Sequence, residues 1–155
     1  MNYLHTISLW QQLEVVVNAV IAALLGSLIG LERDRAGKSA GPRTMALVAA
    51  VSASTVCIGA ILDHNQKLGD PTRAMHAIIT GIGFLGAGLI FTSKKGGAQG
   101  ITTAATVFAT AGMGVATGLG FQAASAGLTL IILIILRSTQ VREKAMSFHS
   151  ENDDD

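Results

Sequence analysis

The chain has 155 residues, half of them hydrophobic and only 14% charged, and its net charge is +1. No Asp or Glu occurs between Asp70 and Glu143. A soluble domain would need charged surface over that stretch, whereas a bilayer penalises each charge at the centre of a spanning helix by about 2.5–3.5 kcal/mol on insertion scales. The length allows one domain, and the composition predicts a small membrane bundle with no nucleic-acid partner.

Five apolar segments follow one another along the chain: 13–31, 44–62, 75–92, 101–118 and 119–136. Each is close to the minimum of about 17 residues that crosses a hydrocarbon core. The third and fourth are so rich in Gly, Ala and Thr that we expect their insertion to depend on packing against the others. The predicted fold is all-α, a polytopic membrane helix bundle of about five transmembrane helices over residues 1–136, followed by a short disordered tail over 137–155.

Positive charge is segregated by this arrangement. Nine of the eleven Lys and Arg residues fall after the first, third and fifth segments: Arg33, Arg35, Lys38, Arg43, Lys94, Lys95, Arg137, Arg142 and Lys144. Only Lys67 and Arg73 fall on the other side. The positive-inside rule therefore predicts an external N-terminus and a cytoplasmic C-terminus.

Polar groups gather where the first segment ends and the second begins. The stretch Leu31–Arg35 carries two acids and two bases, and two further bases follow before Thr44. We interpret this hairpin either as a self-neutralised loop or as a docking surface for a partner. Its candidate functional residues are Glu32, Arg33, Arg43 and Thr44. At the outer start of the third segment the candidate is Arg73.

Glycines recur at spacings that suit close helix packing. Two segments contain small-xxx-small motifs, which let helix backbones approach in lipid, where apolar burial between helices gains little. These faces pack either within the chain or between two copies in a homodimer. The candidate packing residues are Gly26, Gly30, Gly81, Gly83, Gly86, Gly88, Gly112, Gly114 and Gly118. We expect the third and fourth helices to form the close-packed centre.

Threonines line one side of the fourth segment. Thr102, Thr103 and Thr106 are the candidates, and Thr110 continues their face by one turn. Such hydroxyls usually donate to carbonyls of their own helix or bridge to a neighbouring helix. The alternative is a polar pathway through the membrane.

Enzyme chemistry and cofactor sites are not predicted. The run from Gly81 to Gly86 matches a dinucleotide-binding pattern, but it lies inside an apolar segment and no acidic residue follows about twenty positions later. Cys57 is the only cysteine, so one chain cannot build a thiolate metal cluster. Magnesium prefers oxygen ligands with one or two carboxylates, and only Glu14 approaches the membrane interior. This disfavours a dedicated carrier, although backbone carbonyls form some ion filters.

Three stretches resemble the MgtC/SapB family of bacterial inner-membrane proteins. They are GSLIGLERDRAGKSAGPRTMALV at 26–48, DPTRAMHAIITGIGFLGAGLIF at 70–91 and GITTAATVFATAGMGVATGLG at 100–120. The chain departs from the usual family pattern at Met45, where a His is frequent, and mildly at Ile101 and Phe108. Longer members carry a cytosolic ACT-like domain after the last helix, and the 19 residues at 137–155 are too few for us to expect one there.

The resemblance implies a non-enzymatic, multi-pass protein of the bacterial inner membrane, linked to growth in low magnesium and, in pathogens, to virulence. It implies action on a membrane partner, such as the rotary ATP synthase or a magnesium transporter. The alternative is a magnesium or other cation transporter or channel. The scarcity of carboxylates at mid-membrane depth favours modulation of a partner over transport.

Overall fold

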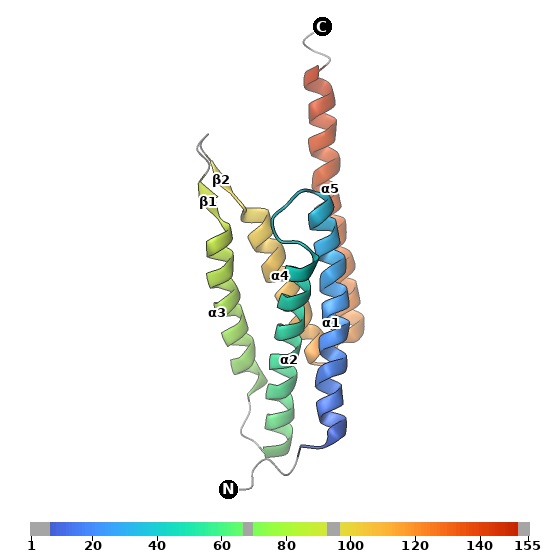
Figure 1. The fold of residues 1–155 in the computed structure, drawn as a ribbon, viewed down its shortest axis with the longest axis vertical. Coiled ribbons are helices and arrows are strands. Elements are labelled where there is room, and N and C mark those ends of the chain that lie inside the picture. Colours follow the sequence, from blue (N-terminus) through green and yellow to red (C-terminus); the bar gives the residue numbers. More distant parts are fainter. Residues whose placement is uncertain (1–6, 67–69, 93–96, 152–155) are drawn as a thin grey trace.

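A computed structural model describes residues 7–66, 70–92 and 97–151, with side-chain positions for 7–64, 70–92 and 97–138. This part of the chain forms α1 (Leu9–Arg35), α2 (Pro42–Gln66), α3 (Pro71–Leu89), β1 (Phe91–Thr92), β2 (Ala98–Gln99), α4 (Ile101–Gly118) and α5 (Gln122–Glu151). The helices run alternately up and down, side by side (Figure 1). Each predicted apolar segment overlaps one helix, which confirms the all-α membrane bundle.

Local sequence signals set the helix ends. Ser8 and Gln11 form a capping box at the start of α1, and Asp70 caps α3 ahead of Pro71. After α4, the N–H of Gly120 donates to the carbonyl of Thr117 at 3.0 Å, and the N–H of Phe121 donates to that of Ala116 at 3.0 Å. This pair of bonds is a Schellman motif, which needs the left-handed backbone that Gly120 adopts at φ 83°.

The centre of the bundle is α2, which lies between α1 and α4. A Cβ added at Gly26 of α1 would lie 2.5 Å from the carbonyl oxygen of Met45, and one added at Gly114 of α4 would lie 2.5 Å from that of Ala49. Both contacts need glycine, because no real side chain tolerates such distances. The tight core therefore consists of α1, α2 and α4.

The third helix lies at the edge of this core, contrary to the expectation that it forms the close-packed centre with the fourth. Ile82 is the only residue of α3 that is buried. A Cβ added at Gly81, Gly83 or Gly88 would meet no atom within 4 Å, so these glycines of α3 are not used for close approach.

Three of the described helices have the length and composition of membrane spans, where about five were predicted. α1, α2 as far as His64, and α4 are each long and apolar enough to cross a bilayer, and α5 has a shorter apolar stretch over Gln122–Ser138. Many large apolar side chains of these helices are exposed, as lipid-facing residues are in a membrane bundle. The chain is thus a multi-pass membrane protein.

Two features differ from the sequence prediction. A two-stranded antiparallel hairpin, in which Phe91 pairs with Gln99, connects α3 to α4. The helix α5 continues to Glu151 and projects beyond the bundle (Figure 1), where a disordered tail is predicted. The C-terminal part of α5 is polar, and it continues the helix that begins in the apolar part of α5. Composition alone does not predict this extension, because a polar segment with no apolar face is typical of a disordered tail.

Candidate functional site

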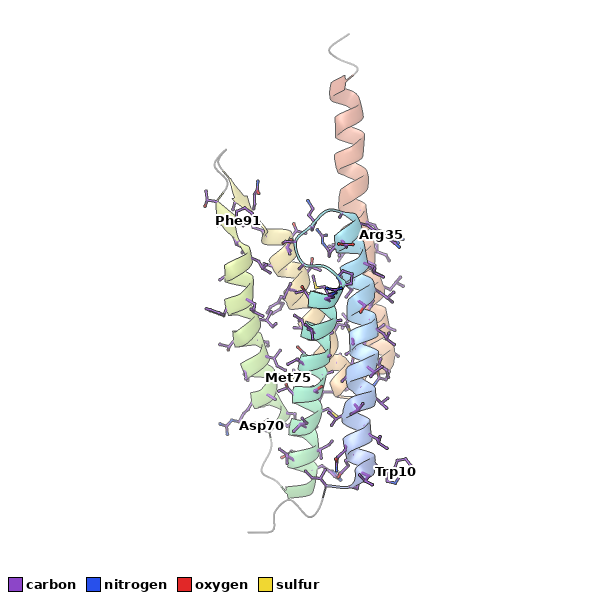
Figure 2. All side chains as sticks on the ribbon, viewed as in Figure 1. Trp10, Arg35, Asp70, Met75 and Phe91 are labelled. Carbon is purple, nitrogen blue, oxygen red and sulfur yellow. The ribbon has the colours of Figure 1, made fainter. Side chains whose placement is uncertain are left out.

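The α1–α2 turn lies at the end of the bundle where Figure 2 labels Arg35, opposite the end that holds Trp10. The N–H of Lys38 donates to the carbonyl of Arg33 at 3.0 Å, and that of Gly37 donates to the carbonyl of Asp34 at 2.9 Å. Gly37 has a φ of 65°, so α1 ends in a second Schellman motif. The turn therefore has a fixed geometry.

Gly30 holds the start of α2 against α1. A Cβ at Gly30 would overlap the backbone of Pro42, so the two helices meet there without an intervening side chain. Pro42 is the first residue of α2, where its missing N–H costs no helix bond. The predicted hairpin candidates are consequently brought together by backbone contact.

The four hairpin candidates divide into a buried pair and an exposed pair. Glu32 and Arg33 are 6% and 3% exposed, and the Oε2 of Glu32 lies 3.6 Å from the Nη1 of Arg33. Within the described residues the Nε of Arg33 has no hydrogen-bond partner. Arg43 and Thr44 are exposed on the first turn of α2. Only the second pair can meet a partner directly, while the first supports the turn from inside.

Arg73 is exposed near the opposite end of the bundle, close to the N-cap of α3. There the Oδ1 of Asp70 accepts hydrogen bonds from the backbone N–H of Thr72 at 2.8 Å and from its hydroxyl at 2.6 Å. These bonds hold the pKa of Asp70 below its ordinary value of 3.8. Arg73 therefore belongs to a separate polar group from the hairpin.

All threonines of α4 except Thr102 face the core. Thr103, Thr106 and Thr110 are buried, whereas Thr102 is exposed. Thr106 donates to the carbonyl of Thr102 at 2.7 Å, and Thr110 donates to that of Thr106 at 2.8 Å. This confirms, for these two residues, the interpretation that the hydroxyls bond to their own helix.

The glycine candidates fall into two groups. Gly26, Gly30, Gly114 and Gly118 lie where helix backbones touch, and a Cβ at Gly118 would overlap the carbonyl oxygen of Ala53. At Gly81, Gly83, Gly88 and Gly112 a Cβ would meet no atom within 4 Å, and at Gly86 it would only touch Ala104 at 3.7 Å. The first group packs within the chain; the second leaves open surface.

Sequence reasoning missed a buried polar junction between α1, α2 and α5. The Nε2 of Gln122 donates to the Oδ1 of Asn18 at 2.8 Å, and the Nδ2 of Asn18 lies 3.7 Å from the Sγ of Cys57. The Oε1 of Gln122 is buried and makes no hydrogen bond with the residues that the structure describes. The sequence did contain an indication of this junction, since Gln122 is the only amide side chain between Gln99 and Gln140 and lies in an apolar stretch.

Metal ligands do not gather in the described part of the chain. No three His, Cys, Asp or Glu side chains lie close enough there to hold an ion. The arrangement instead offers buried hydrogen bonds that fix helices to one another and an exposed basic turn.

Comparisons with known proteins agree with this picture. A family model described as "MgtC family" matches residues 19–145. Protein SapB of Bacillus subtilis is 38% identical over 127 residues, 78% of this chain and 54% of SapB. Protein MgtC of Salmonella typhimurium (strain LT2) is 37% identical over 141 residues, 89% of this chain and 59% of that protein. Protein MgtC of Brucella abortus (strain 2308) is 41% identical over 115 residues, 74% of this chain and 46% of that protein.

This chain spans about half the length of the curated relatives it matches. No solved structure matches it significantly.

Proposed function

The chain belongs to the MgtC family, and on that basis we propose that it is a non-enzymatic protein of the bacterial inner membrane that modulates a membrane partner. The partner we propose is a transport machine such as the rotary ATP synthase or a magnesium transporter. The physiological setting would be adaptation to low magnesium and, in a pathogen, survival inside host cells. The N-terminus would be external and the α1–α2 turn cytoplasmic.

One observation carries this proposal: the core is closed by backbone contact, and the buried hydroxyls of Thr106, Thr110 and Thr117 are already bonded. Gly26 and Gly114 place α1 and α4 directly on α2. The hydroxyls of Thr110 and Thr117 donate to carbonyls of their own helix at 2.8 and 3.0 Å. An ion moving through this core would need free oxygen ligands in place of its water. Such a core suits a helix-packing function better than conduction.

The exposed side of the turn is the proposed contact surface. Arg43 and Thr44 project from a turn that two Schellman bonds and Gly30 hold in place, so a partner would meet a preorganised surface. Glu32 and Arg33 would act indirectly, by supporting that turn.

Substitution of Arg43 tests the proposal. We expect Arg43→Ala to impair growth in low magnesium and to alter membrane potential, with normal protein levels in the membrane. Arg137→Ala, which removes another exposed arginine, from α5, is the matched control and should leave both readouts unchanged. If both variants behave as the unchanged chain does, the turn is not the contact surface. Thr103→Ala is a second test variant. If Arg43→Ala and Thr103→Ala both leave growth in low magnesium and membrane potential unchanged, the proposed function is wrong.

The alternative is a magnesium or other cation transporter, and the buried Oε1 of Gln122 is the specific observation that favours it. A buried oxygen with no bonded donor can coordinate a cation. Purified protein in sealed liposomes loaded with a magnesium-sensitive dye distinguishes the two functions under an imposed potential. Saturable entry of magnesium into the liposomes that Gln122→Leu abolishes would establish transport. If no magnesium enters although the protein is folded and inserted, modulation of a partner is favoured.

A further inference from the structure

An outward face of α3 carries a regular seam of small residues around one aromatic. Ala77, Gly81, Phe84 and Gly88 follow one another at spacings of four, three and four residues. This is the 3.5-residue period of two helices packed as a left-handed pair. All four residues are exposed, Phe84 to 81%. A Cβ at Gly81 or Gly88 would meet no atom, so the surface beside Phe84 is open.

Next to this seam, α2 and α3 leave a groove of about 370 Å³ with apolar walls. The groove is lined by Leu47, Val48, Val51, Ser52, Ile78, Gly81, Ile82 and Leu85. Ser52 is only 3% exposed, and its hydroxyl makes no hydrogen bond with the described residues. The hydroxyls of Ser54 and Thr55, by contrast, each donate to a carbonyl of α2 at 2.8 Å.

The hydroxyl of Ser52 indicates what kind of molecule fits the groove. A hydroxyl without a partner is unfavourable in an apolar environment. A lipid acyl chain would fill the space but has no acceptor to offer. A helix offers acceptors in its hydroxyl side chains, and small residues on both sides allow the backbones to approach. The groove and the seam together therefore favour a helix.

Charge at the outer end of α3 favours a second copy of the same helix. Asp70 and Arg73 are both exposed there, and Arg73 forms no ion pair with the described residues. In a twofold interface, a contact between residue i of one copy and residue j of the other occurs twice. With one acid and one base at the same end of the helix, the acid of each copy can therefore meet the base of the other.

We infer that the seam of α3 and the α2–α3 groove bind a second copy of this chain in the membrane. Phe84 of each copy packs against Gly81 and Gly88 of the other, and Asp70 of each copy pairs with Arg73 of the other. The hydroxyl of Ser52 gains an acceptor in the exposed Thr80 of the other copy, whose own hydroxyl donates to the carbonyl of His76 at 2.9 Å. This inference does not depend on the proposed function.

Disulfide cross-linking in native membranes tests the inference. The single cysteine, Cys57, is buried and stays in place, so the unchanged chain is the background control. Ala77→Cys changes little in size and puts a thiol on the seam, where paired helices bring Cα atoms within about 4.4–6.8 Å, the range for a disulfide. Val20→Cys on α1 and Leu130→Cys on α5 place thiols on other exposed faces.

On oxidation we expect a band of twice the chain mass from Ala77→Cys, and monomer from the two controls. Adding Phe84→Ala should reduce that dimer several-fold, whereas adding Phe121→Ala, which removes another exposed aromatic, should not. Arg73→Asp should reduce it as well, because it places like charges opposite each other. Equal dimer from all three cysteines, monomer only, or an adduct of another mass would each overturn the inference.

Discussion

The contact between α4 and α2 can be tested with two alanine substitutions on the same helix. Gly112 and Gly114 are two positions apart and lie on opposite sides of α4. A Cβ at Gly114 would lie 2.5 Å from the carbonyl oxygen of Ala49 and 3.0 Å from its Cα, while a Cβ at Gly112 would meet nothing within 4 Å. The two variants therefore differ in packing and in little else.

The expected magnitudes follow from two opposing terms. Alanine is favoured over glycine in a helix by about 0.8–1.0 kcal/mol, and both variants gain this. Overpacking a tight contact costs about 1–3 kcal/mol, and only Gly114→Ala incurs it, because the backbone of Ala49 cannot rotate away. Gly112→Ala should then raise the free energy of unfolding by about 1 kcal/mol, and Gly114→Ala should fall about 1–3 kcal/mol below it.

The measurement is an SDS titration of each variant in mild detergent micelles, followed by far-UV circular dichroism. The difference between the two variants isolates the contact, since helix propensity cancels. If their free energies of unfolding agree within about 0.5 kcal/mol, the ordinary scatter of surface substitutions, α4 does not rest on α2 through this glycine.

Two further predictions concern the polar ends of the bundle. Arg33→Leu should lower the free energy of unfolding by about 3–5 kcal/mol, because it removes one partner of a buried ion pair. Arg35→Leu is the control: Arg35 is exposed, so its substitution should change the free energy of unfolding by no more than about 0.5 kcal/mol. Equal effects of the two variants in the same SDS titration would refute the buried pair. The lowered pKa of Asp70 means that its stabilising contribution is present above the ordinary pKa of 3.8 and is lost as the pH falls through the folded-state value. Thr72→Val removes the hydroxyl that donates to Asp70. Thermal unfolding recorded at a series of pH values should then show stability lost at a higher pH than in the unchanged chain. If stability is lost at the same acidic pH in both proteins, the hydrogen bond from Thr72 does not contribute.

Much of the local structure follows from residues close in sequence. The predicted segment 101–118 has the same bounds as α4, because Gly100 and Gly120 take left-handed backbone conformations at its two ends. The small-xxx-small spacing at Gly26 and Gly114 correctly marks helices that approach closely. Composition alone also establishes the membrane environment, since absence of charge over a long stretch is a property of the chain and not of its fold.

What lies between the helices depends on the tertiary structure. Gly114, which touches α2, and Gly81, which faces open space, are both packing candidates by sequence, since the spacing of small residues does not show which helix face another helix covers. The hydrogen bond from Gln122 to Asn18 joins residues 104 positions apart, and no local pattern predicts such a pair. Likewise, Glu32 and Arg33 read as a solvated charge cluster until the fold buries them.

The division has one physical reason. Helix formation, capping and preference for lipid depend on a residue and its neighbours within about one turn, so they can be deduced from the chain in order. Burial, partner choice and open surface depend on which helices meet and at what rotation. Those are decided only when α1 and α4 close on α2 and leave α3 at the edge of the bundle.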